Sequence, residues 1–177
     1  MNAVVSTHAV FDEATGDLLF LAPEELCPPE SGSVTLPDDF ADWSHMWDAG
    51  ARAFVPNLAA LKIAAHAQVK ALRELAKDGG LVTPFGPLQT DPDSRTNING
   101  AVQMAVILGD AFAVDWRMSD DSMATLDAAG MVQMGLIVGQ HVSACQYRKN
   151  ELDDAIEAAG SVEELTAIDL EAGWPGS

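Results

Sequence analysis

The spacing of hydrophobic positions along the chain changes near residue 57. Before this point, short apolar runs at 9–11 and 18–21 flank a polar segment that contains a glycine, which is typical of a β-hairpin. A segment rich in Pro, Gly and Ser follows, and then a short run at 34–37 that indicates a further strand. We therefore expect residues 1–56 to form a small β-rich module.

After residue 57, apolar residues recur every three or four positions, which is the period of one helical face. The first such stretch predicts a helix that Asn57 caps and that ends at Gly79 and Gly80. Its apolar face comprises Leu58, Leu61, Ala65, Val69, Leu72 and Leu75. Its basic residues lie on the other face and are Lys62, Lys70, Arg73 and Lys77.

Further helices and hairpins are expected in the rest of the chain. Asp91 is followed by a proline and is a good N-cap for a helix that ends at Gly109. Asp127 is a good N-cap for the longest helix, which should end near Gly160. A capping box at 161–164 opens a short final helix. The predicted hairpins occupy residues 81–90 and 112–126.

The longest predicted helix has one core face and a GxxxG pattern formed by Gly135 and Gly139. Outside a lipid span, this pattern indicates close packing against another helix in the core. The expected core face is Met131, Met134, Val138, His141 or Val142, Cys145, Leu152 and Ile156. Together these patterns predict an α+β fold, with a small β-rich domain at 1–56 and a mainly helical domain with short β-hairpins at 57–177.

The composition indicates a folded chain with a charged exterior. The chain has 177 residues, of which 48% are hydrophobic, and a formal net charge of −18. The first 50 residues contain ten acidic side chains and no Lys or Arg. An acidic surface disfavours direct binding to nucleic acid or to an anionic membrane. No apolar run is long enough to cross a bilayer. We therefore expect no nucleic acid and no membrane among the partners.

The sequence lacks the motifs of nucleophilic catalysis, phosphate binding and metal binding. Cys27 and Cys145 are far apart, and we expect both to be reduced. The segment 12–17 lacks the ligand spacing of a calcium loop and predicts a hairpin turn instead. The histidines, which are isolated in the sequence, are His8, His45, His66 and His141. We expect no catalytic residue, no metal site and no cofactor.

Aromatic residues gather around a predicted turn at 48–50. Trp43, Trp47 and Phe54 lie in a partly polar context, where a large ring either packs in a local core or anchors a protein partner. Packing in a local core is the default interpretation. A small β-rich module has little room to bury several such rings, so partner binding is the alternative, with Trp43, Trp47 and Phe54 as the candidate partner-binding residues.

Several segments in order along the chain resemble a known family. They are an Ala/Lys-rich helix at 59–77 followed by a Gly/Phe-containing hairpin, the segment DPDSRTNINGA at 91–101, FAVDWR at 112–117, and His141-Val142 within a long helix. The strand, Thr-Gly turn and second strand at 10–21 and the Trp-Asp turn at 47–50 extend the likeness towards the N-terminus. From about Leu58 to Pro175 the chain resembles a domain family of unknown function that recurs in tailed bacteriophages, in small proteins labelled as tail or tail-fibre assembly proteins.

The resemblance implies a role in a phage tail through protein–protein contacts, and it supplies no catalytic residues. The expected partner is a tail-fibre or baseplate protein. The chain would act as an assembly chaperone in the host cytoplasm or as an accessory subunit retained in the virion tail. The alternative, motivated by the net charge of −18, is an acidic DNA mimic that inhibits a host DNA-binding enzyme. An enzyme is the weakest of the three hypotheses.

Overall fold

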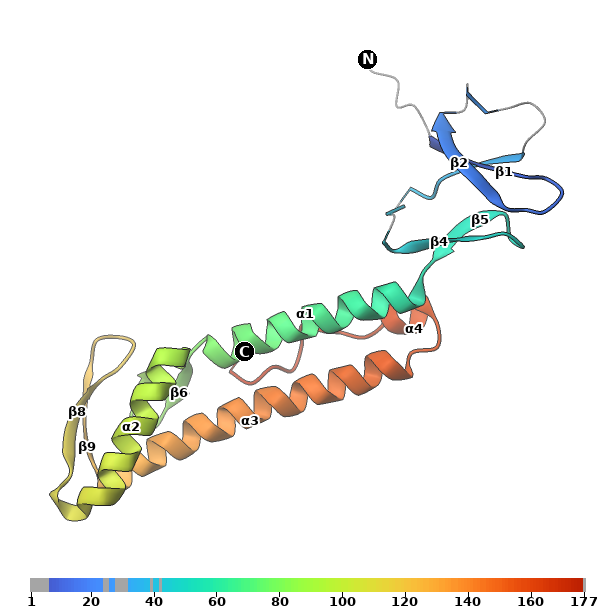
Figure 1. Cartoon of the computed structure of the whole chain (residues 1–177). Helices are drawn as coiled ribbons and strands as arrows, with labels where there is room; N and C mark the ends of the chain where they lie inside the picture. Colours follow the sequence, from blue (N-terminus) through green and yellow to red (C-terminus); the bar gives the residue numbers. More distant parts are fainter. Residues whose placement is uncertain (1–6, 24–25, 28–31, 39, 42, 177) are drawn as a thin grey trace. The chain divides into compact units, whose positions relative to one another are not determined.

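A computed structural model describes residues 7–23, 26–27, 32–38, 40–41 and 43–176 and shows an α+β fold (Figure 1). The chain divides into two compact units. Unit 1 comprises Met1–Ala64 with Ser161–Glu163, and unit 2 comprises Ala65–Gly160 with Glu164–Ser177. The division lies within the first helix, whereas the sequence pattern placed a boundary at residue 57.

Unit 1 is built from two small antiparallel sheets. Strand β1 (Thr7–Phe11) lies between β2 (Leu18–Pro23) and β3 (Gly32–Thr35), so β2 and β3 are the edge strands. Strands β4 (His45–Asp48) and β5 (Ala53–Pro56) form the second sheet. The predicted hairpin at 9–21 and the third strand are thus confirmed, although the third strand begins two residues earlier than its apolar run.

The turn between β1 and β2 forms because Asp12 organises it. Its Oδ1 accepts hydrogen bonds from the backbone N–H groups of Ala14 and Thr15, at 2.7 and 3.0 Å. These two bonds lower the pKa of the Asp12 carboxyl, with the bond from Thr15 contributing most. Gly16 then adopts a φ of +78°, a conformation that glycine tolerates best. The acidic loop is therefore a structured hairpin turn.

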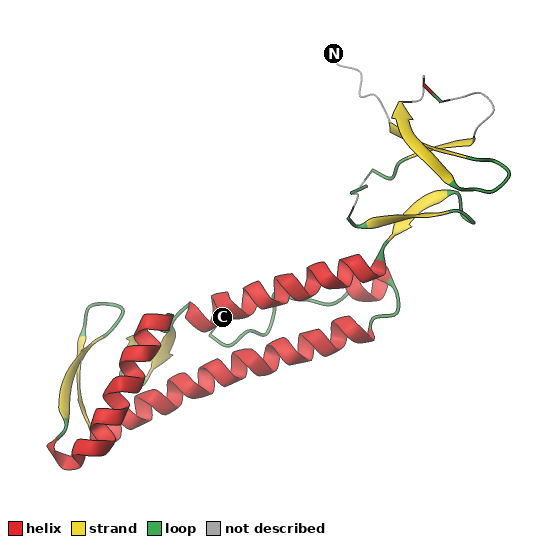
Figure 2. Cartoon of the chain, viewed as in Figure 1, coloured by secondary structure: helices red, strands yellow, loops and turns green. Residues whose placement is uncertain are grey.

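The helices alternate with short hairpins (Figure 2). After α1 (Leu58–Asp78) come β6 (Leu81–Thr83) and β7 (Gly86–Leu88), and then α2 (Pro92–Leu108). The 3₁₀ turn η2 (Gly109–Ala111), β8 (Ala113–Arg117) and β9 (Met123–Asp127) follow. Helices α3 (Ala128–Ala158) and α4 (Val162–Thr166) complete the order. These elements confirm the predicted helices and hairpins.

Helices α2 and α3 begin where their N-cap carboxylates satisfy free backbone N–H groups. Asp91 Oδ1 accepts hydrogen bonds from the N–H groups of Asp93 and Ser94, at 3.0 and 3.1 Å. Asp127 Oδ1 accepts a hydrogen bond from the N–H of Gly130 at 2.8 Å. Both caps were predicted from the sequence alone.

The core of unit 2 lies where α2, α3 and the two hairpins meet. The predicted buried face of α3 is confirmed, and His141 rather than Val142 is its buried member at the ambiguous step. The helices approach closely at Gly135, where an added Cβ would lie 2.6 Å from Val102 Cγ2. The core residues are Leu88, Ile98, Ala105, Phe112, Met118, Leu126, Met131, Met134 and Val138.

The expected division of α1 into an apolar core face and a basic outer face is wrong in part. Val69 is buried, but Leu75 is 70% exposed. Arg73 and Lys77 have side chains only 24% and 17% exposed, and both pair with Glu74. Arg73 Nη1 also donates a 2.7 Å hydrogen bond to Gln146 on α3. Part of the predicted apolar face therefore meets solvent, and a polar contact with α3 forms on the face that was expected to point outward.

Candidate protein-interaction site

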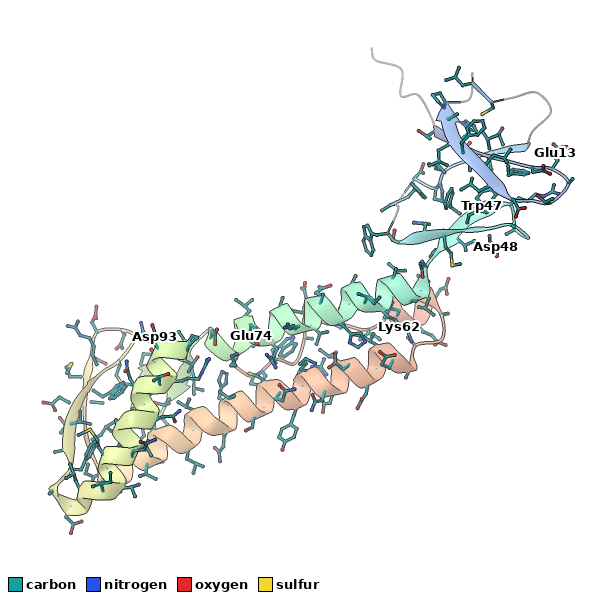
Figure 3. The ribbon with its side chains drawn as sticks, viewed as in Figure 1. Glu13, Trp47, Asp48, Lys62, Glu74 and Asp93 are labelled. Atoms are coloured by element: carbon teal, nitrogen blue, oxygen red, sulfur yellow. The ribbon has the colours of Figure 1, made fainter. Side chains whose placement is uncertain are left out.

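The candidate ring of Trp47 packs within unit 1 (Figure 3). Its centroid lies 5.7 Å from that of Phe11 on β1 and 5.3 Å from that of Phe54 on β5. Its Nε1 donates a 3.0 Å hydrogen bond to the carbonyl of Gly16 in the β1–β2 turn. Trp47 therefore connects the two sheets of unit 1, and it remains half-buried.

Phe54 belongs to the same aromatic cluster, whereas Trp43 does not share its burial. The Phe54 ring meets that of Phe40 edge-on, with centroids 4.8 Å apart. Trp43 is 59% exposed. The structure thus packs Trp47 against Phe54, and it leaves Trp43 as the most exposed of the three candidate rings.

Arg52 stabilises the same cluster from one side. Its guanidinium carbon lies 5.5 Å from the centroid of the Phe11 ring, a cation–π arrangement. Its Nη2 donates a 2.6 Å hydrogen bond to the carbonyl of Glu13. Arg52, the first basic residue of the chain, therefore contacts two residues of unit 1 while it remains exposed.

Strand β2 exposes an apolar surface that the sequence pattern did not predict. Leu19, Phe20 and Leu21 are consecutive and are each more than 40% exposed. Among the residues that the structure describes, this strand pairs with β1 along one side only, and no residue from Leu18 to Pro23 is charged. A continuous apolar run in a hairpin strand is the available signal, because a sheet with one covered face should alternate apolar and polar residues. Exposed apolar edge strands are sites of pairing with other chains.

A cluster of charged side chains in unit 2 was also missed. His66 on α1 is 2.8 Å through Nδ1 from Asp153 Oδ1 and 2.9 Å through Nε2 from Glu157 Oε1, both on α3. The hydrogen bond with Asp153 is the main reason that the pKa of His66 rises above its ordinary value. Burial works against the charge of Asp153, but its bonds with Lys149 and His66 still lower the pKa of its carboxyl. Isolated positions 87 residues apart gave no sequence signal for this contact.

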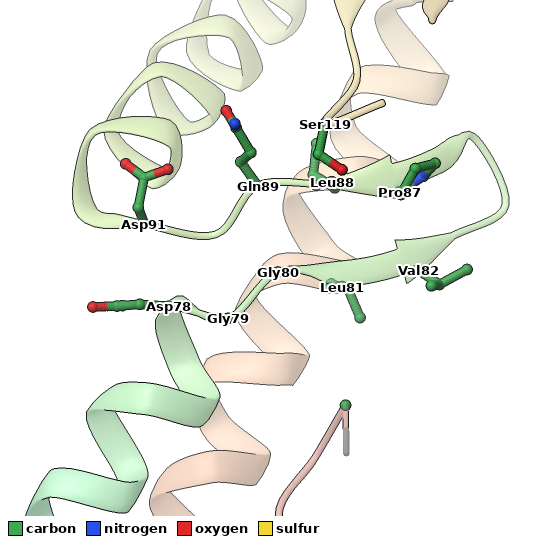
Figure 4. A pocket seen from close by; sticks show the side chains of 11 residues that line it. Asp78, Gly79, Gly80, Leu81, Val82, Pro87, Leu88, Gln89, Asp91 and Ser119 are labelled. Atoms are coloured by element: carbon green, nitrogen blue, oxygen red, sulfur yellow. The ribbon is translucent and has the colours of Figure 1, made fainter. Parts of the chain in front are cut away.

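An open groove of about 450 Å³ lies at the C-terminal end of α1, beside the β6–β7 hairpin (Figure 4). Two carboxylates line it. Asp78 is bonded to Arg95, and Asp91 is the N-cap of α2 and also accepts a 2.5 Å hydrogen bond from Ser94 Oγ. Both acids therefore hold the fold of the groove in place.

Groupings of metal ligands and helices that could span a membrane are both absent from the residues that the structure describes. No group of three or more His, Cys, Asp or Glu there is placed to hold a metal ion. No helix in that part of the chain is long and apolar enough to span a bilayer. Burial raises the pKa of the Cys145 thiol, as expected for an unreactive core residue.

Comparison with known proteins gives a single kind of match. No curated protein and no solved structure matches the chain. The model of a family described as "Domain of unknown function (DUF4376)" matches residues 60–172. This range extends from the second residue after the start of α1 nearly to the C-terminus and covers more than half of the chain. The chain therefore belongs to the DUF4376 family.

Proposed function

We propose that this protein is associated with phage tail fibres and acts through protein–protein contacts, as a fibre-assembly chaperone or as an accessory subunit of the distal tail. The observation that supports this proposal best is the exposed edge of β2. Three consecutive large apolar side chains on an uncharged edge strand suit docking against another β-rich chain.

Natural proteins usually protect an edge strand with Lys, a bulge or Pro. The pairing of β2 with β1 is irregular at one end, next to Phe11, and the other end of β2 is Pro23. Between these two ends, β2 has no bulge, no proline and no lysine. A fibre chain is long and rich in strands, and it exposes unpaired edges before it assembles. An edge such as β2, with the exposed ring of Trp43 as a second contact in the same unit, would cover such a surface.

The acidic DNA mimic is less well supported. A mimic should present negative charge along a continuous face that imitates a phosphate backbone. Residues 96–108 of α2 and 128–147 of α3 contain no charged side chain. The longest helix of the protein therefore interrupts such a face over much of its length.

Co-expression of the protein with the neighbouring fibre gene tests the proposal. We expect soluble, trimeric fibre to increase in the presence of the wild-type protein and to decrease when Leu19→Lys charges the β2 edge. Val82→Lys is the matched control, because Val82 is 84% exposed on a different hairpin. An unchanged yield of trimeric fibre without the protein would contradict the chaperone role. Mass spectrometry of purified virions separates the two forms of the proposal, since only a subunit persists at a fixed copy number.

A further inference from the structure

Helix α1 has few buried side chains to hold it against α3 in unit 2 (Figure 1). The structure describes all of Leu58–Asp78, and Val69 is the only buried residue in that helix. Seven residues of α3 are buried. Because the hydrophobic effect scales with the apolar area removed from water, it stabilises α1 less than α3. Hydrogen bonds and ion pairs with α3 are therefore more important for holding the part of α1 that belongs to unit 2.

The imidazole of His66 on α1 lies between two carboxylates of α3. Its Nδ1 is 2.8 Å from Asp153 Oδ1, and its Nε2 is 2.9 Å from Glu157 Oε1. An ionised carboxylate accepts hydrogen bonds and donates none, so each of these two contacts needs an N–H on the ring. A neutral imidazole has one N–H, whereas an imidazolium has two. The geometry therefore corresponds to the protonated ring.

The ring of His66 is placed to gain and lose its proton while the protein stays folded. Its side chain is 30% exposed, so solvent reaches it. The pKa of His66 is raised above its ordinary value of 6.5, mainly by the hydrogen bond with Asp153. The ring therefore loses its proton at a pH above 6.5. The other charged residues that line the same shallow depression are Lys70 on α1 and Lys149 and Asp154 on α3.

We propose that His66, Asp153 and Glu157 form a pH-dependent clamp, which holds α1 against α3 while the ring is protonated and releases it when the ring loses a proton. After the ring loses a proton, one bare nitrogen faces a carboxylate oxygen at hydrogen-bond distance. The lone pairs of these two atoms repel each other, so at least one of the two contacts must break. The charge attraction between the ring and the carboxylates is lost at the same time.

Two other hydrogen bonds keep the C-terminal part of α1 attached when the clamp opens. Arg73 Nη1 donates a 2.7 Å hydrogen bond to Gln146 Oε1, and arginine keeps its charge at every relevant pH. The carbonyl of Ala76 accepts a 3.1 Å hydrogen bond from Nε2 of His141, which needs a single N–H. The opening should therefore be local, in the stretch of α1 around His66, and should expose Val69.

Amide hydrogen exchange of the full-length protein tests this inference. At about pH 6, amides of α1 next to His66 should exchange about fivefold more slowly in the wild type than in His66→Gln, the effect of one partly exposed ion pair. At about pH 9, the wild type and His66→Gln should exchange at the same rate. Arg73→Gln is the matched control, because it removes a contact that does not titrate. It should speed exchange relative to the wild type by the same factor at both pH values.

The NMR signals of the His66 ring nitrogens keep the test decisive if His66→Gln does not fold. In the wild type, both nitrogens should be protonated at about pH 6, and one should lose its proton at a pH above 6.5. A neutral ring at about pH 6 would overturn the inference. So would a difference between the wild type and His66→Gln that is equal at the two pH values. The proposed function is unaffected by either result, because its test depends on Leu19.

Discussion

Replacing Gly135 with alanine tests the packing of α2 against α3 directly. An alanine Cβ at this position would lie 2.6 Å from Val102 Cγ2, closer than carbon atoms can approach. Valine has one strongly preferred rotamer in a helix, so Val102 cannot easily turn its methyl group away. The two helices must then separate locally, and the buried residues Ile98 and Ala105 on α2 resist that movement because they already pack in the core.

The magnitude follows from two opposing terms. Alanine in place of glycine in a helix interior stabilises by about 1 kcal/mol. Overpacking a well-packed core costs about 1–3 kcal/mol. Gly139→Ala is the matched control, because it gains the same helix propensity and no atom lies within 4 Å of the new Cβ. The difference in unfolding free energy between the two variants therefore isolates the clash, and we expect Gly135→Ala to be less stable than Gly139→Ala by about 1–3 kcal/mol.

Urea unfolding followed by the helical circular-dichroism signal measures this difference. Low protein concentration keeps association between copies from contributing. Adding Val102→Ala should restore part of the loss in Gly135→Ala, with a coupling energy above about 0.5 kcal/mol in a double-mutant cycle. The reasoning is refuted if the two glycine variants differ by less than about 0.5 kcal/mol, or if removing the Val102 methyl groups gives no rescue.

Three further predictions concern single residues. Because the pKa of His66 is raised in the folded protein, its contribution to the free energy of unfolding is fully present below its ordinary pKa of 6.5. That contribution is lost as the pH rises through the folded pKa. The urea midpoint of the wild-type protein should fall over that pH range. An equal fall in the midpoint of His66→Ala would show that His66 is not its cause. Asp127→Ala should cost about 1 kcal/mol by removing the N-cap of α3, while Asp127→Ser should be nearly neutral; equal losses would exclude the cap as the cause. Trp47→Ala should destabilise unit 1 by about 2 kcal/mol, which is roughly half the cost of the same change at a fully buried site. Limited proteolysis within the residues that precede Arg52 should become faster. Unchanged proteolysis would count against a packing role for Trp47.

The features that could be predicted from the sequence are those that neighbouring residues determine. Asp91 and Asp127 cap helices because their side chains reach N–H groups two or three residues away. The buried face of α3 follows from a 3.6-residue period that is regular enough to outweigh its several glycines. In β8, Val114 and Trp116 alternate with exposed residues as a strand with one covered face requires.

The features that could not be predicted depend on contacts with residues that are distant in the sequence. The period of α1 indicates two faces but does not say which face meets α3, and Leu75 shows that part of the apolar face meets solvent. His66 has an environment set by side chains 87 and 91 residues away. Trp47 and Phe54 are candidate anchors because a small module has little room for large rings. The sequence does not show that these two rings pack against each other and against Phe11 and Phe40, which leaves both half-buried.

The charge of the chain has a different meaning once its ion pairs are known. The residues between 51 and 100 carry a small excess of basic side chains, which suggests a basic surface on α1. In unit 2 most of the basic residues instead pair with acids of the same unit. The pairs are Arg73 and Lys77 with Glu74, Arg95 with Asp78, Arg148 with Glu151, and Lys149 with Asp153. The pair with Lys77 and Arg73 lowers the pKa of Glu74 to about 2. Because these cations are already engaged, a partner meets mostly acidic surface, which repels anions, or the uncharged surfaces of β2, α2 and α3, with Lys70 and Arg117 as exposed basic residues of unit 2. Recognition by this protein should therefore depend on apolar contact, with the acidic remainder restricting where that contact forms.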